Sequence, residues 1–177
     1  MTTTPTQQLR GLLEDIEIAM LTTRRADGHL VSRPMALQKQ APGADLWFVT
    51  SRTSALVGEL RADPHLNLAF YKDHTRGYVS VTGTAVLTDD RETIRTLHAP
   101  DWKVWFEDQG APFDGSADDP RLILIGVTVE SARFLAVDKP QVVVMLEFLK
   151  GMVTGKSPHL GETHQVSGAE LRNRPRE

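Results

Sequence analysis

The sequence predicts a mainly β domain of the α+β class, a small antiparallel barrel with peripheral helices. Short apolar or alternating runs recur along the chain and are separated by turn signals such as Asp27-Gly28. The helical patterns between them are few and short, which disfavours a doubly wound sheet. A length of 177 residues suits a single domain with its own core. We place that domain at residues 1–156 and expect 157–177 to be a polar, mobile tail.

The elements follow in order from the spacing of apolar residues. Leu9, Leu12, Leu13 and Ile16 form one helical stripe and predict a helix near residues 5–15. Pro64 ends a second helix by disfavouring the α region at Asp63, and Asp89 with Glu92 resembles a cap for a third. The predicted strands cover 18–23, 29–39, 46–50, 66–71, 78–87 and 122–129 or as far as 137, and the predicted later helices cover 53–61, 90–98 and 101–105. Gly83 predicts a bulge or a close backbone approach, and 106–120 is expected to be a loop.

Composition narrows the classes of function. The chain contains no cysteine, so disulfides, thiolate metal sites and a cysteine nucleophile are excluded. A formal net charge of −3 gives no support to nucleic-acid binding, which needs a basic face. No apolar run is long enough to span a bilayer, and the first residues do not resemble a signal peptide. The expectation is a soluble cytoplasmic protein with neither nucleic-acid nor membrane partners.

The first candidate site is Ser32–Met35, where Pro34 interrupts a predicted strand. Because proline has no N–H, it is expected on an edge strand or next to a bulge. We expect the backbone groups of Arg33 and Met35 to lose their strand partners and to be free for a planar heterocycle such as an isoalloxazine. An edge strand protected against aggregation explains the same pattern equally well.

The second candidate site is Thr50–Ser54, a hydroxyl-rich turn at a predicted helix start. Free N–H groups and the helix dipole make such a start suitable for an anion, and Arg52 could add a bidentate phosphate contact. Ordinary capping by Ser or Thr is the commoner explanation of this pattern. Trp102 and Trp105 could cover a ring face or simply pack a helix onto the core.

The sequence does not support a metal site, a serine nucleophile or a P-loop. The histidines show neither an i, i+4 pair nor an HExxH motif, so we expect no metal site. No G-x-S-x-G elbow is present, and Gly151–Ser157 lacks the spacing of a P-loop. No side chain stands out as a catalytic acid or base.

Taken in order, the motifs resemble the pyridoxamine 5′-phosphate oxidase-like split-barrel family, and in particular its general stress protein branch. The similarity runs from about residue 8 to residue 156. The matching segments are Ile18–Thr23, Ser32–Met35, Leu46–Ser51, Asn67–Tyr71, Tyr78–Ala85 before Asp89-Asp90, Trp105-Phe106, Asp119–Ile125 and Thr154–Lys156.

The resemblance implies a homodimer of six-stranded antiparallel split barrels with FMN at the subunit interface. It places the ring along Arg33, Pro34 and Met35 and the phosphate at Thr50, Ser51 and Arg52, with Trp47, Phe48 and Val49 leading into that turn. The expected function is that of a flavoprotein of the general stress type, a flavin-dependent oxidoreductase acting on an unidentified small molecule. A non-catalytic flavin-binding or redox-sensing module is the alternative.

The chain departs from the family pattern in two places that bear on function. Leu56 stands where the family usually has a phosphate-binding lysine, which keeps FAD, a deazaflavin or haem open as alternatives to FMN. An aromatic-Trp-Asp motif is replaced by Phe134–Ala136, and the Arg-x-His substrate motif of the true oxidase is absent. We therefore do not expect a true pyridoxamine 5′-phosphate oxidase.

Overall fold

A computed structural model describes residues 3–73, 77–137 and 161–173, together with residues 143, 145, 146 and 150. The helices are α1 (Pro5–Asp15), α2 (Ala55–Ala62), α3 (Arg91–Leu97), α4 (Trp102–Trp105) and α6 (Gly168–Arg172). The strands are β1 (Ile18–Arg24), β2 (Leu30–Ala36), β3 (Leu46–Ser51), β4 (His65–Lys72), β5 (Gly77–Thr88), β6 (Leu122–Ala136) and β7 (Glu162–Ser167). The predicted Thr154–Lys156 motif, the Gly151–Ser157 segment and the boundary at residue 156 lie outside the described residues.

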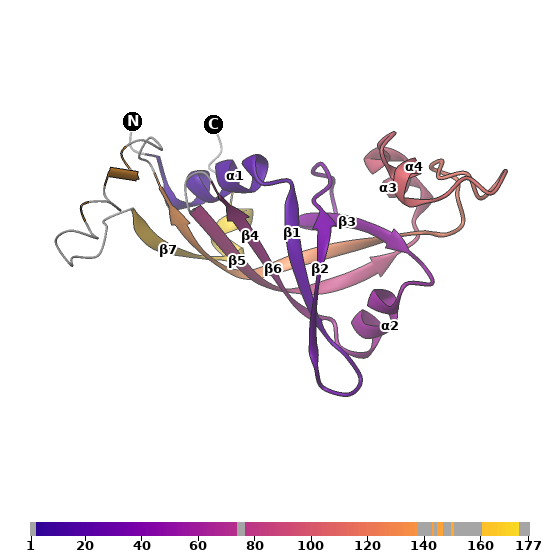
Figure 1. Ribbon diagram of the computed structural model, residues 1–177, viewed down its shortest axis with the longest axis horizontal. Coiled ribbons are helices and arrows are strands. Elements are labelled where there is room, and N and C mark those ends of the chain that lie inside the picture. The colour runs from indigo at the N-terminus through magenta and orange to yellow at the C-terminus, as the bar shows by residue number, and fades with distance from the viewer. Residues whose placement is uncertain are drawn as a thin grey trace.

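The strands form one antiparallel sheet in the order β2-β1-β4-β5-β6-β3, and β7 pairs with the second half of β6. This confirms the mainly β fold with peripheral helices. The terminal strands β2 and β3 approach each other through the hydrogen bond from Gln38 N–H to Trp47 C=O (2.9 Å), but they do not pair as strands. The barrel is therefore split at this point. In Figure 1, α3 and α4 lie at one end of the sheet and β7 at the other.

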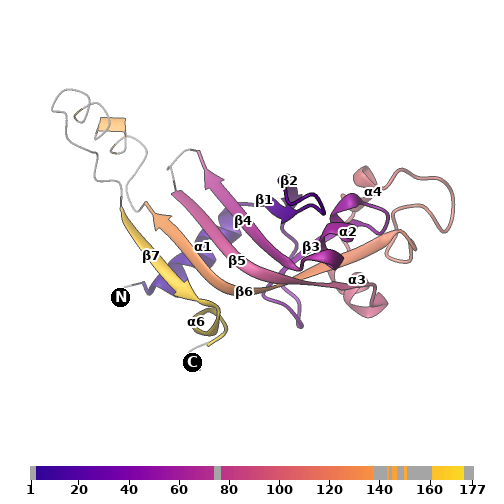
Figure 2. The same cartoon turned by 90° about the horizontal axis from the view of Figure 1, so that it is seen from below.

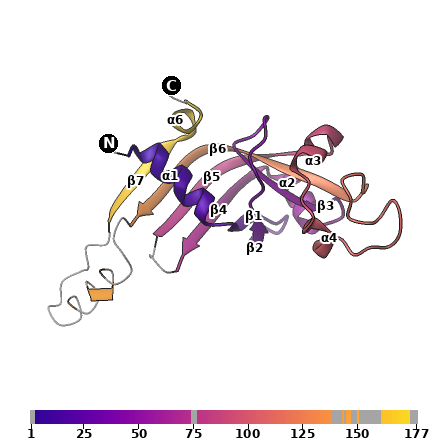
Figure 3. The same ribbon diagram turned by 90° about the horizontal axis from the view of Figure 1, so that it is seen from above.

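One face of the sheet is covered by α1. Leu9 and Leu13 of α1 belong to the main core together with Leu21, Leu68 and Phe70 from the inner face of the sheet. Figure 3 shows α1 across the strands on that face, and in Figure 2 no helix among the described residues lies over the opposite face of β4 and β5. A second cluster, formed by Trp47, Ile94, Leu97, Trp102, Phe106, Leu122 and Leu124, covers that opposite face only near the start of β6.

A bulge separates these two parts of β6. The register of β5 with β6 shifts between Thr82 and Gly83, so that Glu130 has no partner on β5. The inward-facing residues of β6 change accordingly, from Val127 and Val129 before the shift to Ala132 and Phe134 after it. A Cβ on Gly83 would lie 2.5 Å from the Thr128 carbonyl oxygen, which explains the glycine and confirms the predicted close approach.

The C-terminal region differs from the predicted mobile tail. Residues 162–172 form β7 and α6, and Val166 and Leu171 are buried in the main core. Within β7, Val166 is the one side chain that is buried. This strand therefore carries almost no apolar periodicity from which it could be predicted.

Candidate functional site

The free edge of β2 is the first part of the candidate site. Hydrogen bonds from Arg25 N–H to His29 C=O and from Leu37 N–H to Glu17 C=O mark the two ends of the β1–β2 ladder. Because hydrogen-bonded pairs alternate in an antiparallel ladder, the backbone groups of Arg33 and Met35 face β1. The expectation that these two residues lose their partners is wrong, since Pro34 occupies a position whose N–H would point away from β1.

The groups that face away from β1 belong to the neighbouring residues. They are the N–H and C=O of Ser32 and the C=O of Pro34, on a strand that has no neighbour beyond it in the described sheet. The next outward carbonyl, that of Ala36, accepts a hydrogen bond from its own chain, from Gln38 Nε2 (2.9 Å). From Ser32 to Pro34, the edge of β2 thus offers one donor and two acceptors in a row.

The Arg33 side chain reaches from β2 to α2. Its Nη2 donates to Glu59 Oε1 (2.7 Å) and its Nη1 to Thr23 Oγ1 (2.9 Å), while Thr23 Oγ1 donates to Glu59 Oε2 (2.6 Å). Thr23 is almost fully buried, and the side chains of Arg33 and Glu59 are 26% and 11% exposed. The hydrogen bond from Arg33 lowers the pKa of the Glu59 carboxyl below its usual value. The guanidinium is therefore committed to a network within the chain.

The remaining predicted residues on β2 and β3 are divided between the two faces of the sheet. Met35 packs against the main core, and Phe48 is fully buried within it. Trp47 and Val49 face the opposite side and pack in the second cluster, where Trp47 Nε1 donates to the Ala41 carbonyl (3.0 Å). Pro34 is exposed. The side chain of Phe48 thus has no surface to offer a ligand, and β3 contributes through its end rather than its length.

The turn after β3 leads into α2 as the sequence predicts. Ser54 is the N-cap residue, but its side chain makes no capping hydrogen bond. Its hydroxyl instead accepts from Thr50 Oγ1 (3.2 Å), while Ser51 Oγ lies 3.0 Å from Thr53 Oγ1. The first turn of α2 contains no acidic residue. A helix start without a capping side chain, surrounded by hydroxyl groups, remains available to an anion.

Arg52 points away from this helix start. Its Nη2 lies 2.7 Å from Asp89 Oδ2, and its Nε donates to the Pro120 carbonyl (3.3 Å). The two charged side chains are 39% and 60% exposed, so water screens their attraction. The hydrogen bond from Arg52 lowers the pKa of Asp89. Such an exposed pair can open to let the guanidinium contact another anion.

The loop beneath Arg52 is held by a buried carboxylate. Asp119 is fully buried and accepts hydrogen bonds from Gly115 N–H (2.8 Å) and from the Nη2 of Arg121 (2.6 Å). Burial opposes its negative charge, but these hydrogen bonds outweigh that effect and lower the pKa of Asp119 to about 2. Arg52 N–H in turn donates to the Arg121 carbonyl (2.7 Å). The site turn therefore rests on a rigidly anchored loop.

Leu56 has a structural role in this chain. Its side chain is 2% exposed and belongs to the main core with Leu60. A lysine with the same orientation would bring its charge into that core, at a considerable cost in stability. The packing around residue 56 therefore explains why this chain has a leucine where the family usually has a lysine.

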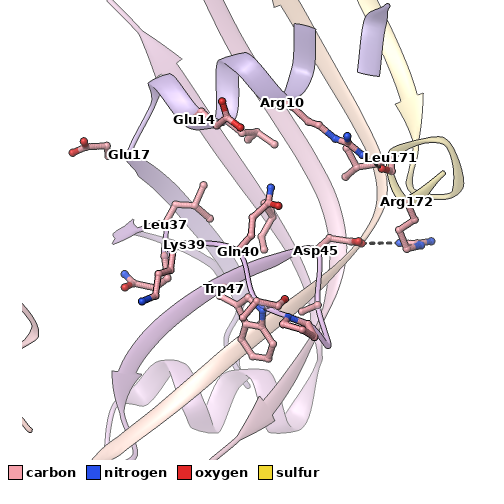
Figure 4. Close-up of a pocket in the computed structure, with 16 residues that line it drawn as sticks. Arg10, Glu14, Glu17, Leu37, Lys39, Gln40, Asp45, Trp47, Leu171 and Arg172 are labelled. Atoms are coloured by element: carbon pink, nitrogen blue, oxygen red, sulfur yellow. Dashed lines mark hydrogen bonds and ion pairs between the residues drawn. The ribbon is translucent and has the colours of Figure 1, made fainter. Parts of the chain in front are cut away.

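A cavity of about 750 Å³ lies next to the end of β2 but outside the predicted site. It is lined by α1, by the segment from Leu37 to Trp47, and by α6 (Figure 4). Arg172 Nη1 closes one side by an ion pair with Asp45 (2.7 Å), and Arg10 Nη2 donates to the Leu171 carbonyl (2.7 Å). Of the predicted site residues it includes Trp47 alone.

The geometry can be compared with known proteins. The sequence profile described as "Pyridoxamine 5′-phosphate oxidase like" matches residues 4–159, which is most of the chain. The chain belongs to this family. Protein bli-3 of Neurospora crassa is 32% identical over 168 residues, covering 93% of this chain and 80% of that protein.

Solved structures agree with the family assignment and with its general stress branch. A protein assigned as general stress protein 26 from Jannaschia sp. CCS1 superposes with a TM-score of 0.69 and 26% identity, covering 92% of this chain and 97% of that one. A haem-binding protein from Mycobacterium smegmatis shares the fold, with a TM-score of 0.64 at 13% identity, and the match covers 97% of this chain and 61% of that one.

Two further observations concern the described residues alone. None of their helices combines the length and the apolar character needed to cross a membrane. They contain no group of three or more His, Asp or Glu side chains arranged to hold a metal ion.

The structure brings the two predicted fragments together, and it does so through residues that the sequence reasoning did not select. Glu59 and Thr23 join β2 to α2, and Asp89 holds Arg52 from 37 residues away. A glutamate in a short helix and a threonine in a strand carry no local signal of such contacts. The alternation of β1 does place Thr23 on its buried face, and a buried threonine needs a hydrogen-bonding partner.

Proposed function

We propose that this member of the family is a flavin-binding protein that takes FMN and works as a flavin-dependent oxidoreductase on a small molecule. The observation that carries the proposal is the contact of Arg33 on β2 with Glu59 on α2, which joins the strand that has the free edge to the helix that has the uncapped start. The Ser32 N–H and C=O, side by side on this edge, suit a ring acceptor and the single N–H donor of an oxidised isoalloxazine. A helix start with free N–H groups suits a phosphate.

The residues present fit both ends of such a ligand. The Ser32 N–H and one of the two carbonyls, that of Ser32 or that of Pro34, would hold the ring. The N–H groups at the start of α2, with the hydroxyls of Thr50 and Ser51, would hold the phosphate, and Arg52 would join them by leaving Asp89. When bound, the flavin supplies the electron or hydride chemistry, while the protein supplies position, charge and exclusion of water.

We propose further that two copies assemble through the uncovered face of the sheet. That face carries exposed apolar side chains in adjacent strands, among them Ile18, Met20 and Tyr71. Met20 pairs with Pro34 on one side and Ala69 on the other, so the apolar surface continues up to the β2 edge. Contiguous exposed apolar surface is typical of a protein interface, and its position would place the ligand between two subunits.

The experiment is a visible spectrum of the purified protein, with mass analysis of any small molecule released on denaturation. We expect a flavin spectrum and the mass of FMN. Colourless protein that also fails to bind added FMN, FAD or deazaflavin would refute flavin binding. Light scattering on Met20→Glu tests the assembly, because a charge on the proposed face should convert dimers into monomers while leaving the fold intact.

A flavin that depends less on its phosphate is the second candidate. Arg33 and Arg52 are both engaged in ion pairs, and Leu56 is buried, so the helix start has less cationic support than its hydroxyl groups suggest. FAD or a deazaflavin bound mainly through the ring would suit this arrangement, and mass analysis distinguishes them from FMN. Bound flavin that NAD(P)H does not reduce would favour a binding or sensing module over an enzyme.

A further inference from the structure

We propose that Glu59 is a positioning residue that couples the two halves of the flavin site. By holding the β1–β2 hairpin against α2, it fixes the distance between the free β2 edge and the helix start. A ligand with a ring and a phosphate can then engage both at once. This inference rests on the proposed function, and it assigns a role to a residue that touches neither the ring edge nor the helix start.

Both carboxylate oxygens of Glu59 accept hydrogen bonds from within the chain. Its two carboxylate oxygens accept from two different strands, from Arg33 on β2 and from Thr23 on β1. Thr23 Oγ1 also accepts from Arg33 Nη1, so each of the three side chains contacts the other two. Networks of this kind, with little exposure to water, hold their members in one arrangement.

The hairpin needs this support because it extends beyond the sheet. The pairing of β1 with β4 covers only Met20, Leu21 and Thr22, and Thr23 is the next residue. From that point the hairpin runs away from the other strands, beside α2 (Figure 1). A second contact, between Arg24 Nε and Asp63 Oδ2, is longer (3.6 Å), and its arginine is largely exposed. The Glu59 network is therefore the stronger connection between the hairpin and α2.

The position of Glu59 within α2 connects it to the phosphate half. It lies four residues after Ala55, about one helical turn from the start of the helix. Arg33, its partner, lies between the two β2 residues that supply the outward-facing groups, Ser32 and Pro34. One ion pair thus joins the centre of the ring edge to the first turns of the helix that receives the phosphate.

The physical consequence concerns ligands that bind at two points. When two binding elements are held at a fixed distance, the second contact forms at a high effective concentration. If the hairpin moves relative to α2, each half still binds its own fragment, but the advantage of binding both is reduced. Loss of Glu59 should therefore weaken FMN, which spans the two halves, more than riboflavin, which reaches only the ring half.

The first experiment measures FMN and riboflavin affinities by fluorescence quenching for the wild type, Glu59→Gln and Thr23→Val. We expect the FMN dissociation constant to rise about tenfold or more in both variants, with less than about a threefold change for riboflavin. Asp118→Asn is the control, because it removes a carboxylate from an exposed ion pair with Arg95 far from the hairpin and should change neither. Equal losses for FMN and riboflavin would overturn the coupling role.

The second experiment needs no flavin. Since the chain has no cysteine, Ala26→Cys in the hairpin turn and Ala62→Cys at the end of α2 give a unique pair of spin-label sites, both exposed. We expect a narrow distance distribution in this background and a clearly broader one when Glu59→Gln is added. An unchanged distribution would overturn the positioning role even if FMN binds. If the wild type binds no flavin while Glu59→Gln still broadens the distribution, the proposed function is refuted. Glu59 is then a structural connection only, and the coupling role is overturned as well.

Discussion

The two halves of the proposed flavin site are built in different ways. At the ring half, Arg33 forms a largely buried network with Glu59 and Thr23, and the free backbone groups are fixed by strand geometry. At the phosphate half, Arg52 forms an exposed pair with Asp89, and the helix start has no capping side chain. The comparison teaches that a buried charged side chain in a binding site stabilises the shape of the site, whereas an exposed one stays available to contact the ligand.

The largest effect is expected at Leu56, where the chain departs from the family pattern. Leu56→Lys should lower the free energy of unfolding by about 3–5 kcal/mol, since it replaces a buried core side chain with a charge. Denaturant unfolding measures this. The matched control is Ala55→Lys, whose position is exposed one residue earlier. That variant should fold normally and bind FMN more tightly, and a well-folded Leu56→Lys protein with improved FMN binding would show that the packing at residue 56 is not limiting.

Removal of Arg33 tests the rigid half. Arg33→Ala leaves the Glu59 carboxylate, which is mostly buried, with Thr23 alone, and should cost about 1.5–3 kcal/mol of stability. Binding of FMN and riboflavin should both weaken, because the β2 edge itself is disturbed. Thermal unfolding and flavin titration measure the two effects. Unchanged stability would mean that the network at the ring half does not hold its shape.

Removal of Arg52 tests the phosphate half of the site. Arg52→Ala should weaken FMN by about tenfold, the equivalent of one charge-assisted hydrogen bond, and leave riboflavin unchanged. Stability should change little, because the pair with Asp89 is exposed. Asp89→Asn is the informative control: it frees Arg52 and should strengthen FMN binding slightly. Equal losses of FMN and riboflavin in Arg52→Ala would exclude Arg52 as a phosphate ligand.

The smallest expected effect is that of Glu59 on how the free energy of unfolding depends on pH. The hydrogen bond from Arg33 lowers the folded-state pKa of Glu59 below its ordinary value of 4.5. A lowered carboxyl pKa adds stability above the unfolded value, and this contribution is lost as the pH falls through the folded value. Unfolding free energies measured from pH 6 to pH 3 should therefore fall less steeply for Glu59→Gln than for the wild type. Parallel curves would contradict the assigned pKa direction.

Local patterns in the sequence were sufficient for much of the fold. The Asp27-Gly28 turn closes the β1–β2 hairpin, with Gly28 at a φ of 86°, and Gly83 marks the close approach to β6. Gly28 has a positive φ that few residues adopt, and Gly83 leaves no room for a Cβ, so in both cases the residue type itself carries the information. By contrast, β7 was missed because its polar residues show no alternation.

The site was harder to predict because its contacts are distant in the sequence. Strand position alone explains why Pro34 lies on an edge, but the hydrogen-bonding phase that points Ser32 outward follows only from the pairing with β1. Likewise, a free arginine and an arginine held by Asp89 look the same in the sequence. Side chains that pair across the fold cannot be assigned before the fold is known.

The extra residue in β6, Glu130, is absorbed by the bulge, and this keeps apolar side chains in the core on both sides of it. Side chains alternate along a strand, so an inserted residue exchanges the two faces for everything that follows it. If no bulge absorbed Glu130, Phe134 would point out of the barrel and Arg133 into it, and the C-terminal half of β6 would turn its apolar residues toward solvent. One residue without a partner on β5 thus lets a single long strand serve two surroundings, with both faces buried at one end and only one face buried at the other.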